Sequence, residues 1–224
     1  MKIALIGYGK MGHAIEALAE EHGHSVTLKL DKGDQWPEKM DADVAIEFST
    51  PTTAVENMLR CIEAGVPVVC GTTGWYERYN DVAEACRKGG GRLLTATNFS
   101  IGMNIMFALN ERLAQLMRGR SEYSVDITET HHIHKLDAPS GTAITLQEQI
   151  VENGERKAAS IPIESIREGE VPGTHTVRYD SEIDTITLTH EAHSRKGLAL
   201  GALLAAEWLA KAAPGVYTMK DVLN

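Results

Sequence analysis

The chain has 224 residues, of which 43% are hydrophobic and 24% are charged, as in a folded protein of one large domain or two modest ones. Its formal net charge of −9 argues against nucleic acid or an anionic membrane surface as the main partner, although a local basic pocket can still bind a small anion. The three cysteines include no CxxC pair, which argues against a disulfide framework or a zinc ribbon. The sequence shows neither a signal-peptide pattern nor an apolar stretch approaching the roughly 20 residues of a membrane span, so we expect a cytoplasmic protein.

Strand and helix patterns alternate over the first hundred residues. Residues 2–6 (KIALI) predict a strand that runs through the turn GYGKMG into a helix. Further strands are predicted at 26–30, 43–49, 67–70 and 92–97, with helices at 52–65 and 77–88. Strands that alternate with helices need crossover connections, which produce a parallel sheet covered on both faces. The predicted fold class is therefore α/β, with a Rossmann-type doubly wound parallel sheet.

The pattern changes near residue 100. A helix at about 102–117 precedes a strand at 123–129, a loop, and a second helix that ends near Gly154. The first of these helices carries on one face Ile105, Leu109, Leu113 and Leu116. Strand-like segments that look antiparallel follow at 160–167, 174–180 and 183–190. These elements predict a second, smaller α+β domain carrying a mixed sheet.

Two domains follow from this change of pattern. We expect residues 1–100 plus 196–224 to bind a dinucleotide, and residues 101–195 to bind substrate and to make the oligomer contacts. The nearly all-round apolar helix at 197–213 is expected to be buried against other elements. A hinge is expected where the chain crosses between the domains, and Arg195, which lies there, either contacts a ligand or forms a hinge salt bridge. Closure of such a hinge would exclude water from the reaction.

The turn GYGKMG has the G-x-G-x-x-G pattern of a dinucleotide-binding loop, placed between a strand and a helix. Gly7 permits the tight turn, Gly9 lets the backbone approach a pyrophosphate, and Gly12 lets the helix pack close to the strand. Asp31 ends the second strand, where a carboxylate can bind ribose hydroxyls. Asp31 favours NADH, whereas Lys32 either grips the 2′-phosphate of NADPH or is a solvated surface lysine. The expected cofactor is thus NADH or NADPH.

Other strand ends add candidate cofactor contacts, because ligands of an open parallel sheet bind beyond the carboxyl ends of its strands. Phe48 and Ser49 follow the third strand, and the segments GTTG at 71–74 and ATNF at 96–99 follow the fourth and fifth. The hydroxyls of GTTG suit contact with ribose and nicotinamide, although such a turn is also an ordinary structural element.

The run ETHHIHKLDAPSGTA at 129–143 places three imidazoles, a lysine and a turn that opens onto a helix within one short segment. Imidazole suits proton transfer near neutral pH, and ammonium and helix N–H groups suit a carboxylate. Metal binding is disfavoured, because His131 and His134 lie in a predicted loop without the helical HExxH spacing and next to Lys135. The segment therefore predicts a reaction centre that moves a proton and binds an acidic small molecule.

These motifs resemble the 4-hydroxy-tetrahydrodipicolinate reductase family of lysine biosynthesis. The resemblance rests on GYGKMG, EFSTP, VVCGTTG, ATNFSIGMN and above all on the pattern E-x-H-H-x-x-K-x-D-x-P-S-G-T-A, and it extends through VPGTHTV, THEAHSR and YTMKDVL. It implies an oxidoreductase of the lysine and diaminopimelate pathway, in which hydride passes from NAD(P)H to a cyclic unsaturated dicarboxylate. It also implies a homotetramer formed through the sheet of the second domain.

The resemblance implies a role for individual residues. His131 would be the proton donor and Lys135 the second catalytic group. The residues expected to bind substrate are His132, Ser140, Gly141 and Thr142. Together with the strand ends, the expected cofactor-binding residues are Gly7, Tyr8, Gly9, Lys10, Met11, Gly12, Asp31, Lys32, Phe48, Ser49, Gly71, Thr72, Thr73, Ala96, Thr97, Asn98 and Phe99.

The chain departs from the family pattern at three places. Its glycine loop is one residue shorter than the commoner form, Thr50 stands where many members carry an arginine near the 2′-phosphate, and the region 160–182 is shorter than in many members. The shorter glycine loop could shift the contacts with the diphosphate, and Thr50 weakens the case for NADPH. The shorter 160–182 region affects the sheet edge of the second domain and the expected oligomer contacts. Two alternatives stay open: a related Rossmann dehydrogenase acting on another amino-acid-derived dicarboxylate, and a non-catalytic nucleotide-sensing regulator.

Overall fold

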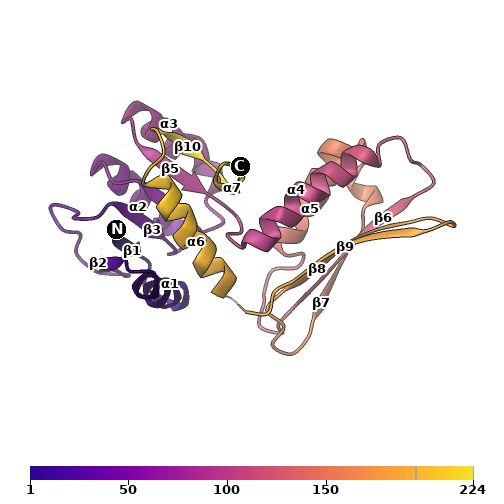
Figure 1. Ribbon diagram of the computed structural model, residues 1–224, viewed down its shortest axis with the longest axis horizontal. Coiled ribbons are helices and arrows are strands. Elements are labelled where there is room, and N and C mark those ends of the chain that lie inside the picture. The colour runs from indigo at the N-terminus through magenta and orange to yellow at the C-terminus, as the bar shows by residue number, and fades with distance from the viewer. Residues whose placement is uncertain (195, 224) are drawn as a thin grey trace. The chain divides into compact units, whose positions relative to one another are not determined.

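The chain divides into two compact units in the computed structural model, which describes residues 1–194 and 196–223. Unit 1 comprises Met1–Ser100 and Lys196–Asn224, and unit 2 comprises Ile101–Arg195 (Figure 1). The functional role of each unit stays a prediction. Arg195, whose ligand contact the sequence left open, lies outside the described residues. In the described part of the chain, no helix is long and apolar enough to cross a membrane.

Unit 1 contains, among its described residues, a six-stranded parallel sheet in the order β10-β5-β4-β3-β1-β2. Its strands are β1 (Lys2–Ile6), β2 (Ser25–Leu30), β3 (Val44–Glu47), β4 (Val68–Cys70), β5 (Arg92–Thr95) and β10 (Gly215–Tyr217). The predicted doubly wound α/β class is confirmed. The sequence prediction missed β10, because a strand of three residues carries too little alternation to stand out from a loop.

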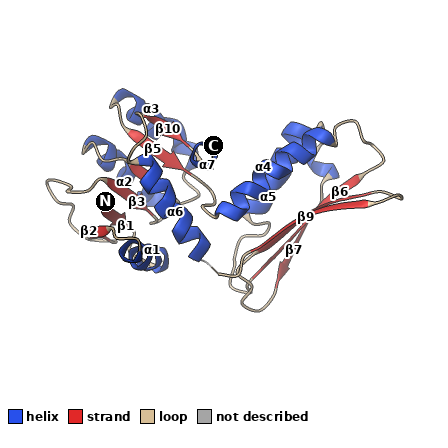
Figure 2. Ribbon diagram, in the orientation of Figure 1, coloured by secondary structure: helices blue, strands red, loops and turns tan. Residues whose placement is uncertain are grey.

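Helices cover both faces of this sheet (Figure 2). They are α1 (Lys10–Glu21), α2 (Pro51–Glu63), the short η1 (Tyr76–Arg78), α3 (Tyr79–Lys88), α6 (Lys196–Leu209) and α7 (Met219–Leu223). Successive residues of a strand point to opposite faces, so Ile3 and Leu5 pack with α1 and α6, whereas Ala4 and Ile6 pack with α2 and α3. Burial on both faces explains the continuous apolar runs of these strands. The predicted burial of the last long helix is confirmed by Ala199, Ala202 and Leu203 on α6, among others.

Unit 2 is a layer of two helices on a mixed sheet of four strands, counted over its described residues, in the order β7-β6-β8-β9. The elements are α4 (Ile101–Leu116), β6 (Ser124–His131), α5 (Gly141–Gly154), η2 (Ala158–Ser160), β7 (Ile163–Arg167), β8 (Thr174–Asp180) and β9 (Thr185–Glu191). Strands β6, β8 and β9 pair antiparallel, but β7 pairs parallel with β6. Strands β7, β8 and β9 thus alternate in direction, as expected of antiparallel segments, but β7 pairs with β6 and not with β8. The chain crosses through α5 between β6 and β7, and such a crossover returns a strand in the same direction.

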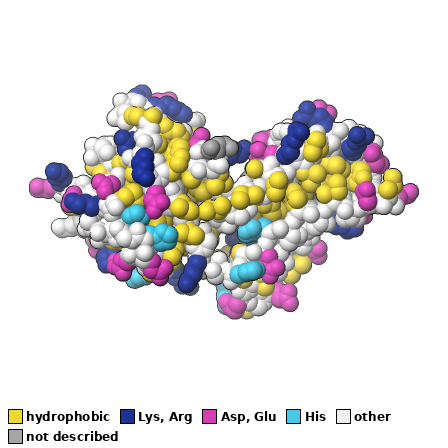
Figure 3. All heavy atoms as spheres, viewed as in Figure 1, with side chains coloured by type: hydrophobic (Ala, Val, Ile, Leu, Met, Phe, Trp, Pro, Cys, Tyr) yellow, Lys and Arg dark blue, Asp and Glu magenta, His cyan; other side chains and the backbone are white. Residues whose placement is uncertain are grey.

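Helix α4 buries a different face from the apolar one seen in the sequence. Its buried residues are Met103, Met106, Phe107, Asn110 and Ala114, which pack against α5 and the sheet or hydrogen-bond to α5. Ile105, Leu109 and Leu116 are instead 50%, 52% and 58% exposed. The helix has apolar residues on both sides, and the sequence alone does not show which side meets α5. Hydrophobic side chains accordingly gather at the surface over α4 (Figure 3).

Candidate active site

Two hollows in unit 1 lie at the carboxyl ends of its central strands. One, of about 520 Å³, extends from the ends of β1 and β3 to Asp31 and Lys32 beyond β2. The other, of about 430 Å³, is lined by residues that follow β1, β3 and β4. The strand order reverses between β1 and β3, and such a switch point is where open α/β sheets bind ligands. Both volumes fall in the range of small-molecule and cofactor pockets.

Many of the predicted cofactor residues line these hollows. The larger one includes Gly7, Gly9, Asp31, Lys32, Phe48 and Ser49. The smaller one includes Gly9, Lys10, Met11, Phe48, Ser49, Gly71, Thr72 and Thr73. Thr50, the departure from the family pattern, also lines the larger hollow. Sequence reasoning missed Trp36 and Arg60 of the same wall, because neither belongs to a motif.

The glycines of the turn after β1 have different physical roles. Gly7 has φ of 88°, and a Cβ on it would lie 2.0 Å from the carbonyl oxygen of Phe48. A Cβ on Gly12 would lie 2.7 Å from the carbonyl oxygen of Gly7. A Cβ on Gly9 would meet no atom of the described chain within 4 Å, and Gly9 caps the N-terminus of α1. Gly7 and Gly12 are thus required by packing, whereas Gly9 leaves the positive end of α1 open to a diphosphate, which fits a dinucleotide.

Some predicted cofactor residues lie elsewhere. The residues that line neither hollow are Tyr8, Gly12, Ala96, Thr97, Asn98 and Phe99. The Tyr8 hydroxyl hydrogen-bonds to the Glu16 carboxylate, and the Phe99 side chain is buried 5.8 Å from the ring of Phe48. Asn98 accepts a hydrogen bond from the Ser100 backbone N–H at 2.8 Å. Tyr8, Asn98 and Phe99 therefore make contacts that stabilise the fold. Their role in cofactor binding stays a prediction.

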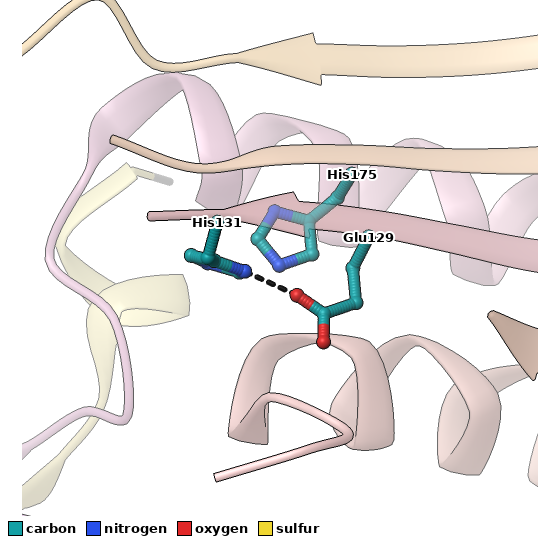
Figure 4. Close-up of side chains that lie close together, drawn as sticks. All are labelled: Glu129, His131 and His175. Carbon is teal, nitrogen blue, oxygen red and sulfur yellow. Dashed lines mark hydrogen bonds and ion pairs between the residues drawn. The ribbon is translucent and has the colours of Figure 1, made fainter. Parts of the chain in front are cut away.

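The candidate reaction centre of unit 2 is built around two neighbours on one face of β6. This strand extends through His131, so the loop predicted from the sequence begins later than expected. Alternation along β6 places Glu129 and His131 on the same buried face, where the imidazole Nδ1 and a carboxylate oxygen are hydrogen-bonded (Figure 4). Glu129 is fully buried and His131 is 8% exposed. A buried carboxylate beside a buried imidazole is typical of a proton-transfer pair.

Glu129 also connects β7 and the start of α5. Arg167 donates from Nη2 to Glu129 Oε1 at 2.9 Å, and the Ser140 backbone N–H donates to the same oxygen at 3.2 Å. Burial alone would raise the Glu129 pKa, but hydrogen bonds from Arg167 and His131 outweigh it and lower the pKa below its ordinary value. Glu129 is therefore an anion that holds three elements together.

The Glu129 carboxylate determines which nitrogen of His131 carries a proton. A carboxylate can only accept, so His131 must hold its proton on Nδ1. Burial lowers the His131 pKa, and the opposing effect of Glu129 does not restore it. The other nitrogen, Nε2, faces Gly173, where an added Cβ would lie 3.0 Å away. Nε2 can donate a proton only when the ring is an imidazolium.

His175 is a functional candidate that the sequence analysis missed. It lies on β8 directly opposite Glu129 of β6, and its ring centroid is 5.0 Å from that of His131. Its Nε2 lies 3.1 Å from the Ser140 hydroxyl. Burial, followed by the charge of His131, lowers the His175 pKa to about 4, so this imidazole is neutral near pH 7. The signal in the sequence was the alternation in THTVRYD, which predicts a histidine on the buried face.

The loop after β6 contributes the predicted anion-binding groups. Lys135 donates from Nζ to both carboxylate oxygens of Asp137, at 2.8 and 2.9 Å. Ser140 caps α5, and its hydroxyl accepts from the Ala143 N–H at 3.2 Å. Gly141 and Thr142 form the first turn of α5, which contains no acidic residue. The Asp137 carboxylate of the preceding loop interacts with the Gly141 backbone N–H, which helps to lower the Asp137 pKa, so a substrate carboxylate must compete with Asp137 there. His132 follows His131 directly after the strand.

Glu129, His131 and His175 form a group with the ligand types of a metal site. One ligand atom from each lies within 4.8 Å of the others. The group combines two residues of β6 with one of β8. It includes His131 but not His134, the partner considered in the sequence analysis. The His134 side chain is 70% exposed and faces Glu170 at 3.4 Å. The Arg167 guanidinium, which is ion-paired with Glu129, would repel a metal ion bound to the same carboxylate. This repulsion agrees with the expectation of no metal, which stays a prediction.

Hollows at the switch point of a doubly wound sheet, and a buried imidazole–carboxylate pair beside the start of a helix, are features that fit a nucleotide-dependent oxidoreductase of small molecules. Profiles described as dihydrodipicolinate reductase, N-terminus and C-terminus, match residues 1–99 and 102–223. The chain belongs to the dihydrodipicolinate reductase family, which confirms the predicted resemblance. Membership makes it an oxidoreductase with a pyridine nucleotide cofactor.

Curated relatives match over nearly the full chain. A 4-hydroxy-tetrahydrodipicolinate reductase of Christiangramia forsetii is 48% identical over 100% of this chain and 98% of its own length. One of Alkaliphilus oremlandii is 35% identical over 96% of this chain and 95% of its own length. A solved dihydrodipicolinate reductase of Paenisporosarcina sp. TG-14, with dipicolinate bound, covers 99% of this chain and 98% of its own with a TM-score of 0.81. Its 22% identity supports the fold alone.

Proposed function

We propose that this chain reduces 4-hydroxy-tetrahydrodipicolinate to tetrahydrodipicolinate in lysine and diaminopimelate biosynthesis, with NADH or NADPH as the reductant and His131 as the proton donor. The activity follows from the family and from relatives that share it over the full chain. The observation that carries the role of His131 is its buried pairing with Glu129 beside the start of α5. The cytoplasmic location stays a prediction.

The residues of unit 2 suit the substrate half of the reaction. The N–H groups of the first turn of α5, with the hydroxyls of Ser140 and Thr142, would hold one carboxylate of the dicarboxylate substrate. The Lys135 ammonium would bind a substrate carboxylate or stabilise negative charge that develops on the substrate, and His132 would contact the substrate ring. Lys135 is already ion-paired to Asp137, so the substrate must compete for the ammonium or share it with that carboxylate.

The residues of unit 1 would hold the dinucleotide through the glycine turn, Asp31 and the strand ends of the smaller hollow. When bound, the reduced nicotinamide supplies the hydride. Loss of the substrate hydroxyl as water gives a conjugated imine, and hydride addition to this imine leaves an electron-rich enamine. The imidazolium of His131 would protonate the enamine from Nε2 while Glu129 keeps the Nδ1 proton in place. A dianionic substrate nearby favours the imidazolium, which offsets the effect of burial on the His131 pKa.

Steady-state kinetics with freshly prepared substrate and each nicotinamide tests this function. His131→Gln should lower kcat by about 100-fold or more, as expected for loss of a general acid, while the KM of the nicotinamide changes little. His134→Gln is the matched control, because this exposed imidazole lies in the same segment. Wild-type turnover in His131→Gln would contradict the role of His131, and lack of NAD(P)H oxidation by the wild-type chain would contradict the function.

We further propose a homotetramer formed through the open face of the unit 2 sheet. Helices α4 and α5 cover one face of this sheet. The other face carries a row of threonines on adjacent strands, including Thr128, Thr176 and Thr189, and side chains of this type pack well between sheets. Light scattering of the purified chain should give the mass of four chains, and Thr187→Lys, placed on the same face, should lower it. A monomer mass for the wild-type chain would contradict this assembly.

A further inference from the structure

We propose that Trp36 and Arg60 form the wall that binds the adenine base of the cofactor, and that they contribute equally to NADH and NADPH binding. The Arg60 guanidinium lies over the Trp36 indole, 5.0 Å from the ring centroid. Both residues line the hollow of about 520 Å³ that contains Asp31 and Gly9. This inference rests on the proposal that unit 1 binds the dinucleotide in that hollow.

Arg60 is available for a ligand because its neighbours are otherwise engaged. It lies in the last turn of α2, where Glu56, four residues earlier, is its natural ion-pair partner. Glu56 instead accepts a hydrogen bond at 3.1 Å from Arg78, the last residue of η1. Among the described residues, no carboxylate pairs with Arg60, and its partner is the indole. An exposed guanidinium that lies over an aromatic ring remains accessible to a planar ligand, on which it can stack.

The position of the Trp36 ring is fixed by packing against the core of unit 1. The indole is partly buried and packs against the core cluster beneath α2 and α3. The ring therefore has little freedom to move, and the Arg60 side chain resting on it is also restricted. A wall that is ordered before the ligand arrives loses less conformational entropy on binding.

The order of groups along the hollow indicates which part of the dinucleotide meets this wall. Gly9 lies at the start of α1, where a diphosphate binds, and Asp31 lies where ribose hydroxyls bind. The group that follows the ribose in either nicotinamide cofactor is the adenine base. The face of an indole offers a phosphate no positive charge, whereas an indole and a guanidinium both offer a planar base a stacking surface. Lys32, next to Asp31, is the better-placed group for a 2′-phosphate.

Calorimetric titration with NADH and NADPH tests the inference. Arg60→Ala and Trp36→Ala should each weaken both nucleotides by the same factor, about 5- to 20-fold, which is the size expected for loss of one stacking partner. Lys32→Ala should weaken NADPH alone. Arg87→Ala is the matched control, because it removes an exposed arginine of α3 that lines neither hollow, and it should leave both affinities unchanged.

Reduced nicotinamide mononucleotide, which has no adenine, separates base binding from general damage. If the wall binds adenine, Arg60→Ala and Trp36→Ala should oxidise this donor at the wild-type rate. Trp36→Phe keeps a ring, and it should recover most of the NADH affinity if the Ala variant loses stability. Selective loss of NADPH in Arg60→Ala, or unchanged affinity for both nucleotides, would overturn the inference while the proposed function stands. A wild-type chain that binds neither nucleotide would overturn both.

Discussion

The two candidate sites of this chain are built from different materials. The glycine turn beside the hollows of unit 1 is built from main chain at the ends of parallel strands, where Gly7 and Gly12 lie in close contact with neighbouring backbone. The reaction centre of unit 2 is made of charged and polar side chains from β6, β7, β8 and α5 that hydrogen-bond to one another. The first kind of site is sensitive to added volume, and the second to a changed proton or charge.

This difference also determines how each site responds to a mutation. The glycine turn has few side chains to lose, so a substitution within it costs stability mainly where it adds a Cβ at a point where two main chains touch. A side-chain network depends on every donor and acceptor being satisfied, so a change of one atom in it is costly even when the shape is kept. The following predictions test this contrast.

The largest effect is expected for Glu129→Gln. The amide has nearly the shape of the carboxylate, but it no longer fixes the Nδ1 proton of His131 or balances the Arg167 charge. We expect kcat to fall roughly 100- to 1,000-fold, as when a triad carboxylate loses its charge, with little change in the nicotinamide KM. Kinetics measured over pH 5–8 should also show a displaced profile, which a purely structural defect would not produce.

Glu152→Gln provides the matched control for this substitution. Glu152 is an exposed residue of α5, on the helical layer and not on the open face of the sheet, so the same change from carboxylate to amide should leave kcat and the pH profile unchanged. Wild-type turnover in Glu129→Gln would show that Glu129 neither orients His131 nor supports the charge, and it would remove the contrast between the two sites.

The contrast also explains what the sequence could predict. The glycine turn, Asp31 and the strand ends are local features, and a short motif is enough to place them on a parallel sheet. The histidine run was found for the same reason. Glu129 joins His175 only because β8 pairs with β6 in one register, and Arg167 joins them only because β7 returns parallel. Such neighbours are set by long-range pairing, and single-sequence patterns do not encode that pairing.

The exposed face of α4 and the strand β10 were missed for related reasons. Both sides of α4 are apolar, and the buried side includes the polar Asn110, which donates to the Leu146 carbonyl and to Gln149 of α5. A polar residue on a buried face weakens the apparent apolar period of that face. Strand β10 is three residues long and is held by pairing with β5, about 120 residues earlier in the chain.

A second prediction compares two glycines of the same turn. Gly7→Ala places a Cβ 2.0 Å from the Phe48 carbonyl oxygen at a φ of 88°, so the two strand ends must separate. We expect a loss of roughly 2–4 kcal/mol in the free energy of unfolding, from left-handed strain and overpacking together. Gly9→Ala adds its Cβ in open space at a φ of −87°, so stability should be nearly unchanged while nucleotide affinity falls.

Urea unfolding and calorimetric titration of both variants distinguish these outcomes. If Gly7→Ala is as stable as the wild-type chain, the close approach of the two strand ends does not determine the site. If Gly9→Ala binds NADH with wild-type affinity, the start of α1 is not where the diphosphate lies.

The smallest predicted effect concerns pH and belongs to unit 2. The pKa values of His131, His175 and His190 are all lowered, chiefly by burial, and that of His175 lies at about 4. A lowered histidine pKa means that the unfolded chain binds more protons than the folded chain between the two pKa values, so stability falls as the pH falls. For His175 this pH window runs from about 6.5 to about 4. Because His175 resists protonation in the folded chain, the free energy of unfolding should fall by about 2 kcal/mol between pH 6.5 and 4.5.

Urea unfolding across this window checks the prediction, with His175→Gln as the test variant. The glutamine cannot titrate, so the variant should lose less stability between pH 6.5 and 4.5 than the wild-type chain does, whatever its stability at pH 7. The pKa values of the Glu129 and Asp137 carboxylates are also lowered, and their unfolded pKa values lie near 4. The stability that these carboxylates contribute is therefore lost mainly below about pH 4, outside the window of His175. Equal slopes for the two chains would mean that His175 is solvated in the folded state, and the reaction centre would then lack the dry side-chain network that sets it apart from the nucleotide hollows.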